Sequence, residues 1–177
     1  AFANELSNIS PIPGVTFDVD GQCSYCALHD RMDIQYPTGT RGELALEKMV
    51  DTIREAGRGK EFDCILGVSG GCDSSFLAHE MVRRGLRPLA VHFDNTWNSP
   101  IATNNIYTML DQLEVPLETL VVDNGEYDDI YRAFIESGVR DLEAPTDIGF
   151  MATLYMAAER HGIRYIVEGH SFRTEGV

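Results

Sequence analysis

Apolar residues recur at two kinds of spacing from Arg41 to the end of the chain. The short, nearly continuous apolar run at residues 64–68 is typical of a strand buried on both faces of a parallel sheet, and residues 88–93, 117–122 and 165–167 predict three further strands. Before and between these runs, apolar residues three or four positions apart predict amphipathic helices. The residues expected to face inward are Leu46, Met49, Val50 and Ile53 in the first helix; Phe76, Leu77, Met81 and Val82 in the second; Ile106, Met109, Leu110 and Leu113 in the third; Tyr127, Ile130, Tyr131, Phe134 and Ile135 in the fourth; and Ile148, Met151, Tyr155 and Ala158 in the fifth. Because strands alternate with helices, the pattern predicts right-handed crossovers and a doubly wound parallel sheet of the α/β class.

Residues 1–40 show no sustained periodicity and are rich in Pro, Gly, Asp and Asn. They predict an irregular N-terminal segment, followed by one α/β domain over residues 41–177. The last predicted strand ends shortly before Val177, where such a domain would ordinarily continue with a helix and another strand. We therefore expect the domain to be truncated at its C-terminal end. Because the first residue is not Met, we also expect further N-terminal sequence.

The composition favours a cytoplasmic protein that acts on small molecules or on another protein. The 177 residues carry 14 Lys and Arg against 28 Asp and Glu, a formal net charge of −14. Because nucleic-acid binding depends on neutralising phosphates, this balance argues against an extended nucleic-acid-binding face. No apolar run approaches the roughly 20 residues needed to cross a bilayer, and the N-terminus does not resemble a signal peptide. The four cysteines do not form the pattern of a secreted disulfide framework.

The sequence VSGGCDSS, between the first predicted strand and its helix, carries the clearest chemical signal. Two adjacent glycines allow the backbone to come close to a ligand, and successive N–H groups at a helix N-terminus bind anions. The hydroxyl groups of Ser69, Ser74 and Ser75 would add hydrogen-bond donors. The segment therefore predicts a phosphate-binding loop. It lacks the Lys of a Walker A loop and the spacing of a dinucleotide-binding GxGxxG motif.

The string SGGxDSS resembles the PP-loop of the N-type ATP pyrophosphatases, the superfamily that includes nucleotide-activating domains of GMP synthetase, NAD synthetase and tRNA thiolation enzymes. The resemblance implies the adenine nucleotide alpha hydrolase-like fold. It also implies a reaction in which ATP adenylates a carbonyl or carboxylate oxygen, pyrophosphate leaves, and a nitrogen or sulfur nucleophile displaces AMP. Loop donors aimed at the β- and γ-phosphates would stabilise the charge that develops on pyrophosphate. The ATP-binding residues implied by the resemblance are Ser69, Gly70, Gly71, Cys72, Asp73, Ser74 and Ser75.

Asp73 has two interpretations. The resemblance makes it a catalytic residue that holds Mg²⁺, a hard cation that prefers carboxylates together with phosphate oxygens. In the simpler interpretation it is only a favourable negative charge at a helix N-terminus.

A second polar segment, EGHSFRTEG, follows the last predicted strand. In amidating PP-loop enzymes the corresponding loop carries a Glu that shares the metal with the loop Asp. The resemblance therefore assigns Glu175 as a catalytic residue and second Mg²⁺ ligand, and Gly169 to the nucleotide site. Arg173 is a further catalytic candidate that would meet phosphate or substrate, and the alternative is that it faces solvent.

The second predicted strand runs into the sequence DNTWNS. In related folds the backbone of this strand reads the adenine edge, and residues at its tip approach the ribose. The resemblance therefore makes Val91, Phe93 and Asp94 candidates for ATP binding. Trp97, the only tryptophan, has two interpretations: it caps an edge of the core, or it stacks on the substrate.

Cys23 and Cys26 form a CxxC motif after the turn DVDGQ. Two thiolates are half of a structural zinc site, which needs four ligands, and His29 offers a third. A thioredoxin-like role is disfavoured because the motif does not follow a buried strand at the start of a helix. Neither Cys64, inside a predicted buried strand, nor Cys72, inside the phosphate loop, resembles a glutaminase nucleophile.

The segments FDVDGQCSYC, GVSGGCDSS, VHFDNTWNS and GHSFRTEG resemble, in this order, the N-acetyl sugar amidotransferases of lipopolysaccharide and flagellin-glycan biosynthesis. The resemblance implies an enzyme that activates the acetamido group of a nucleotide-linked sugar and converts it into an acetamidino group. The ammonia would come from a separate glutaminase subunit. The family usually carries an earlier CxxC that completes a zinc-ribbon-like set, but residues 3–10 contain no cysteine. Zn²⁺ at Cys23 and Cys26 is therefore left open, as is a homodimer.

Two other functions stay open. The first is a PP-loop sulfurtransferase of the tRNA thiolation type, against which the net charge of −14 argues. The second is a non-catalytic adenine nucleotide-binding module, against which the pair of Asp73 and Glu175 argues.

Overall fold

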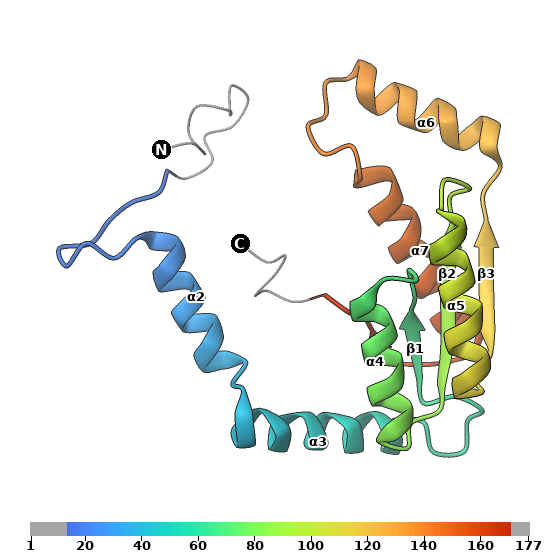
Figure 1. Cartoon of the computed structure of the whole chain (residues 1–177), viewed down its shortest axis with the longest axis horizontal. Coiled ribbons are helices and arrows are strands. Elements are labelled where there is room, and N and C mark those ends of the chain that lie inside the picture. The colour runs from blue at the N-terminus through green and yellow to red at the C-terminus, as the bar shows by residue number, and fades with distance from the viewer. Residues whose placement is uncertain (1–13, 171–177) are drawn as a thin grey trace. The chain divides into compact units, whose positions relative to one another are not determined.

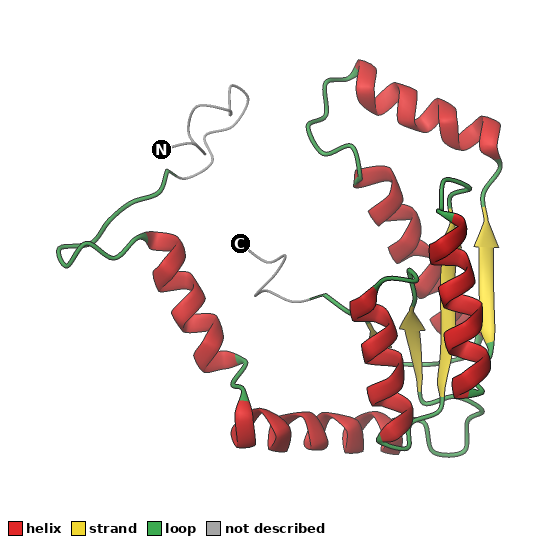
Figure 2. Ribbon diagram, viewed as in Figure 1, coloured by secondary structure: helices red, strands yellow, loops and turns green. Residues whose placement is uncertain are grey.

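The computed structural model describes residues 14–170, which contain six helices and four strands (Figure 1, Figure 2). In chain order these elements are α2 (Ser24–Gln35), α3 (Gly39–Ala56), β1 (Cys64–Gly67), α4 (Cys72–Arg83), β2 (Pro88–Asp94), α5 (Pro100–Leu113), β3 (Leu117–Val121), α6 (Asn124–Glu136), α7 (Ala144–Arg160) and β4 (Ile166–Val167). The larger of two compact units is Lys48–Gly169, and the smaller one includes the described residues 14–47 and His170. None of the described helices is both long enough and apolar enough to cross a membrane.

The larger unit is built on a four-stranded parallel sheet with the strand order β3-β2-β1-β4. The arrows of β1 and β3 point the same way in Figure 1, and β2 pairs in parallel with both strands. The chain moves outward from β1 to β2 and β3, and β4 then pairs with the opposite side of β1. This reversal creates a topological switch point at the carboxyl end of β1. Open α/β sheets bind their ligands at such points.

Neighbouring residues of the central strands pack against helices on opposite faces of the sheet. Ile65 and Leu89 belong to a core cluster with residues of α7, whereas Leu66 and Ala90 belong to another with residues of α4 and α5. In Figure 1, α4 and α5 lie in front of the sheet and α7 lies behind it. Burial on both faces explains the nearly continuous apolar runs of β1 and β2, whereas β3 is partly exposed and β4 half-buried. The predicted doubly wound α/β class is therefore confirmed.

The predicted helices are present, but several residues expected inside are exposed. In α7 the buried residues include Leu154 and Ala157, whereas Ile148 and Tyr155 are each 63% exposed. The cause is that apolar residues are nearly continuous along this helix, so their spacing does not define one face. The expected core residues that are exposed are Met49, Phe76, Ile130, Ile135, Ile148 and Tyr155.

The N-terminal segment is less irregular than predicted. Residues 24–35 form the helix α2, and α3 begins at Gly39 rather than near Arg41. No apolar periodicity marks α2 in the sequence, because none of its residues is buried. Its start is instead fixed locally, by the cap that Cys23 provides.

Candidate functional site

The predicted phosphate loop lies at the switch point of the sheet. It connects the end of β1 to α4, whose N-cap is Gly71 and whose first helical residue is Cys72. The N–H groups in the first turn of an α-helix have no partner within the helix, and the helix dipole makes this end attractive to anions. Gly71, Cys72 and Asp73 are exposed, so this helix end is accessible to a ligand.

Gly70 has a backbone conformation that favours glycine. Its φ is +76°, and a Cβ at this position would lie 2.2 Å from the carbonyl oxygen of Ala102. The Gly70 carbonyl accepts a hydrogen bond of 3.2 Å from the Asn105 amide. The loop is therefore packed closely on the first turns of α5, and only glycine fits there without displacing backbone.

The serine hydroxyls of the loop mainly hold the loop itself. Ser75 Oγ donates to the Gly71 carbonyl at 2.8 Å, and Ser74 Oγ lies 3.3 Å from the same carbonyl. Ser74 Oγ is also 3.2 Å from Ser69 Oγ and accepts from the Ser69 N–H at 3.3 Å. These bonds fix the loop shape. The groups best placed for an anion are consequently the backbone N–H groups in the first turn of α4, which have no partner within the helix, rather than the hydroxyls expected from the sequence.

Asp73 is exposed in the first turn of α4. Its carboxylate fits one ligand of a Mg²⁺ ion that takes its remaining ligands from phosphate oxygens and water. The predicted second ligand, Glu175, and the catalytic candidate Arg173 lie outside the described residues. Gly169, just before them, lies against the first turn of α4, because a Cβ there would be 3.0 Å from the Ser74 nitrogen. The loop after β4 therefore reaches the phosphate loop.

A buried histidine that the sequence did not single out connects the phosphate loop to the next loop. His92 of β2 lies with Nδ1 2.9 Å from the Val68 carbonyl oxygen and Nε2 3.3 Å from the Asn98 amide nitrogen. Since a carbonyl only accepts, Nδ1 carries the proton and Nε2 accepts from Asn98. The same amide donates to Asp94 Oδ1 at 2.9 Å. His92 therefore fixes the loop after β2 relative to the phosphate loop.

The predicted adenine-site residues lie on β2, but two of their side chains face the core. Val91 is 1% and Phe93 is 7% exposed, so only their backbone groups could meet a nucleotide. The Val91 carbonyl already accepts the Val68 N–H at 3.1 Å. Asp94 is half-buried, and its Oδ1 accepts the Thr96 N–H at 2.8 Å as well as the Asn98 amide. Their roles in ATP binding remain predictions.

Trp97 joins an aromatic cluster beyond the carboxyl end of β2, formed by Phe93, Trp97, Tyr127 and Tyr131. The Trp97 ring centroid lies 4.4 Å from that of Tyr131 and 5.7 Å from that of Tyr127. Phe93 and Tyr127 meet edge to face at 5.9 Å. The hydroxyl of Thr146 hydrogen-bonds with both tyrosine hydroxyls. Burial raises the pKa of Tyr127, which keeps its phenol protonated.

The CxxC motif lies at the start of a helix, contrary to the prediction. Cys23 is the N-cap of α2, and its Sγ accepts the Cys26 N–H at 3.2 Å and lies 3.1 Å from Cys26 Sγ. The hydrogen bond from the Cys26 side chain lowers the pKa of Cys23, and the same pairing raises the pKa of Cys26. His29, the predicted third zinc ligand, lies 3.6 Å from Asp33. Within residues 14–170 no group of three or more His, Cys, Asp or Glu side chains is arranged to hold a metal. Zn²⁺ at Cys23 and Cys26 stays a prediction.

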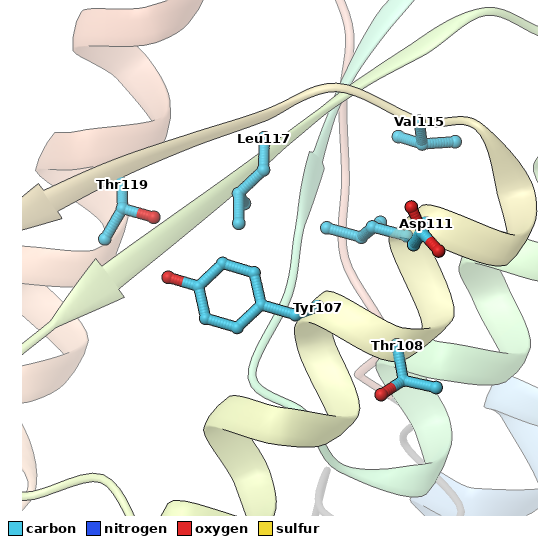
Figure 3. Close-up of a pocket in the computed structure, with 7 residues that line it drawn as sticks. Tyr107, Thr108, Asp111, Val115, Leu117 and Thr119 are labelled. Carbon is cyan, nitrogen blue, oxygen red and sulfur yellow. The ribbon is translucent and has the colours of Figure 1, made fainter.

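A hollow of about 750 Å³ lies between α5 and β3 (Figure 3). Its lining residues are Tyr107, Thr108, Leu110, Asp111, Val115, Leu117 and Thr119. Leu117 is the first and Thr119 the middle residue of β3, so the hollow does not reach the carboxyl end of this strand. None of the residues predicted to bind ATP lines this hollow, so it is separate from the phosphate-loop site.

No protein-family model matches the sequence, and no curated protein does. Solved structures do match. The chain is similar to the NMN synthetase of Francisella tularensis, with 21% identity and a TM-score of 0.50 over 71% of this chain and 53% of that one. It is similar to the NH₃-dependent NAD synthetase of Campylobacter jejuni, with 20% identity and a TM-score of 0.51 over 71% and 55% of the two chains.

A third similar structure is the glutamine-dependent NAD⁺ synthetase of Acinetobacter baumannii in complex with ADP. The identity is 16% and the TM-score 0.57, over 70% of this chain and 24% of that one. The chain spans about half the length of the first two synthetases. At these identities the likeness establishes the fold alone, an α/β fold with a parallel sheet like that of the NAD and NMN synthetases.

Proposed function

We propose that the larger unit is the nucleotide-activating domain of an ATP-dependent amidating enzyme. The observation that carries the proposal is the loop from Ser69 to Ser75, with Gly70 at φ +76° and an exposed helix N-terminus at the switch point of the sheet. This arrangement suits a triphosphate whose terminal pyrophosphate must leave. The names of two similar structures, an NH₃-dependent and a glutamine-dependent synthetase, support a nitrogen nucleophile.

The proposed reaction has two steps. First, a carbonyl oxygen of the acceptor attacks the α-phosphorus of ATP, and the bond to pyrophosphate breaks. The backbone N–H groups at the start of α4 would stabilise the charge that develops on pyrophosphate. Second, ammonia adds to the activated carbon, loses protons, and expels AMP together with the former carbonyl oxygen. A C=O group is thereby converted into C=NH, and no oxidant or reductant is required.

Asp73 would hold Mg²⁺ in this site, with Glu175 as the proposed second carboxylate. When bound, Mg²⁺ neutralises charge on the phosphate oxygens and orients them. The residues of the chain supply the remaining functions. Gly70 permits the close approach of the loop to α5, and His92 positions the loop that follows β2.

For the acceptor we propose a nucleotide-linked acetamido sugar, whose acetamido carbonyl would be converted into an acetamidino group. The order of the motifs in the sequence supports this class of acceptor, and ammonia would be delivered by a separate glutaminase subunit. Free ammonium should replace that subunit in vitro.

The test is to incubate the protein with ATP, Mg²⁺, ammonium and UDP-linked acetamido sugars, and to measure AMP, pyrophosphate and the mass of the sugar. We expect equal release of AMP and pyrophosphate, together with a sugar in which NH has replaced O. The Asp73→Asn variant is the matched control and should release neither product. Incorporation of sulfur, or turnover only with tRNA, would move the assignment to the thiolation enzymes.

A further inference from the structure

Trp97 occupies an unusual position for a large aromatic residue. It is 53% exposed, although one side of its ring system covers the buried residues Tyr127 and Tyr131. It lies in the loop after β2, the strand adjacent to β1 and its phosphate loop. An aromatic surface is therefore open to solvent at the edge of the sheet where ligands bind.

The loop holds Trp97 in a defined position. Asp94 Oδ1 accepts the Thr96 N–H at 2.8 Å, and Asn95 Oδ1 accepts the Trp97 N–H at 3.0 Å. Between these bonds Thr96 has a φ of +67°, a left-handed conformation that β-branched residues rarely adopt. Strained backbone of this kind persists only where the surroundings enforce it, and it concentrates at binding sites.

Polar groups adjoin the aromatic surface. The Thr146 hydroxyl contacts the hydroxyls of Tyr127 and Tyr131 and accepts from the Asn95 amide at 3.4 Å. An exposed indole beside fixed hydroxyl and amide groups suits a ligand with an apolar face and a polar rim. A pyranose ring has this character, because its axial C–H bonds form an apolar face and its hydroxyl and acetamido groups form the rim.

Hydrogen bonds connect the loop that carries Trp97 to the phosphate loop. Asn98, one residue after Trp97, bonds to His92, which in turn bonds to the carbonyl of Val68 at the start of the phosphate loop. An acceptor that reacts at the α-phosphorus must lie beside the phosphate loop. A ring held against Trp97 would meet this requirement from the β2 side.

We propose that Trp97, supported by Tyr127 and Tyr131, is the stacking surface for the sugar ring of the acceptor. The proposal rests on the proposed function and assigns the specificity for the acceptor, as distinct from ATP, to the loop after β2. Trp97 is then a binding residue, whereas Asn95 and Thr96 position it.

Trp97 is the only tryptophan of the chain, so its fluorescence reports on this site alone. The first experiment titrates the protein with UDP-linked 2-acetamido sugars of the gluco, galacto and manno series, with UDP alone and with a non-hydrolysable ATP analogue. We expect at least one of the sugars to shift and quench the emission, and UDP or the ATP analogue to leave it nearly unchanged. An equal response to UDP alone or to the ATP analogue would indicate that the Trp97 indole contacts a nucleobase rather than the sugar, and would overturn the proposal. So would the absence of any response to the three sugars.

The second experiment compares variants by calorimetric binding. Trp97→Ala should weaken binding of the responsive sugar by about tenfold or more and leave ATP affinity unchanged. Trp97→Phe should retain most of the sugar affinity. Tyr107→Ala is the matched control, because Tyr107 is similarly exposed, at 59%, but lines the hollow between α5 and β3. Unchanged sugar affinity in Trp97→Ala overturns the proposal. Circular dichroism verifies that each variant is folded.

These measurements separate the two proposals. Sugar binding that depends on Trp97, without release of pyrophosphate from ATP, would contradict the proposed function and leave the stacking surface intact. Amidination that is insensitive to Trp97→Ala would contradict the stacking surface and leave the proposed function intact.

Discussion

The substitution Gly70→Ala tests whether the phosphate loop requires glycine for its shape. The added Cβ would lie 2.2 Å from the Ala102 carbonyl oxygen, whereas real Cβ contacts essentially never fall below 3.0 Å. The first turn of α5 or the loop must therefore move by at least about 0.8 Å. Because the displaced atom belongs to the backbone, the strain cannot be relieved by rotating a side chain.

Two costs combine in this variant. An L-residue in the left-handed region costs roughly 1–2 kcal/mol. Forcing extra volume into a packed region typically costs about 1–3 kcal/mol. We therefore expect Gly70→Ala to lower the free energy of unfolding by about 2–5 kcal/mol, a large fraction of the stability of an ordinary domain. The displaced loop should also bind ATP more weakly.

The assay is urea unfolding followed by circular dichroism, together with calorimetric titration of ATP into each variant. Gly71→Ala is the matched control, since Gly71 has a φ of −82° and its added Cβ would lie 3.4 Å from Ser69 Oγ. It should cost about 1 kcal/mol or less, the usual penalty for Ala at an N-cap. If Gly70→Ala unfolds at the urea concentration of the unsubstituted protein and binds ATP equally well, the reasoning is refuted.

Three further predictions concern charge and protonation. Asp73→Asn should weaken ATP binding about tenfold in the presence of Mg²⁺ but not in the presence of EDTA. Equal weakening under both conditions would show that Asp73 does not bind Mg²⁺. Because the pKa of Cys23 is lowered and that of Cys26 raised, iodoacetamide at mildly alkaline pH should alkylate Cys23 first, and peptide mass spectrometry showing the reverse order would contradict this. The hydrogen bond from Arg83 lowers the pKa of Glu80 from 4.5 to about 2, so the stability it contributes is complete above pH 4.5 and is lost as the pH falls toward 2. Glu80→Gln should therefore be destabilised at pH 7, and a difference in urea midpoint that persists at pH 2 would contradict the assignment.

The centre of the sheet could be predicted because β1 and β2 are buried on both faces, whereas β3 and β4 are only partly buried. Ile65 and Leu66 pack on opposite sides, so both must be apolar, and the resulting run is visible in the sequence. The phosphate loop could be predicted for a related reason. Its glycines and serines directly follow such a run, and the fold then places them at the switch point.

The positions of individual side chains were harder to predict. The inward face of α7 was misjudged because almost every residue between Ile148 and Ala158 is apolar or small. The role of His92 depends on its contact with the carbonyl of Val68. Val68 lies 24 residues earlier in the chain and directly follows β1, whereas His92 belongs to β2. No local pattern reports such a contact. The same holds for Thr146, which meets Tyr127 and Tyr131 only after α6 and α7 pack together.

The hydroxyl of Thr146 has one proton and two lone pairs, but three partners. Asn95 Oδ1 accepts from the Trp97 nitrogen, so the amide must present its nitrogen to Thr146 and occupy one lone pair. One lone pair and one proton then remain for Tyr127 and Tyr131, so one tyrosine donates to Thr146 and the other accepts from it. The accepting tyrosine keeps its own proton for the neighbouring tyrosine or for a ligand. The two arrangements exchange only when the Thr146 hydroxyl and both phenolic hydroxyls reorient together, and a ligand that accepts from one phenol selects between them.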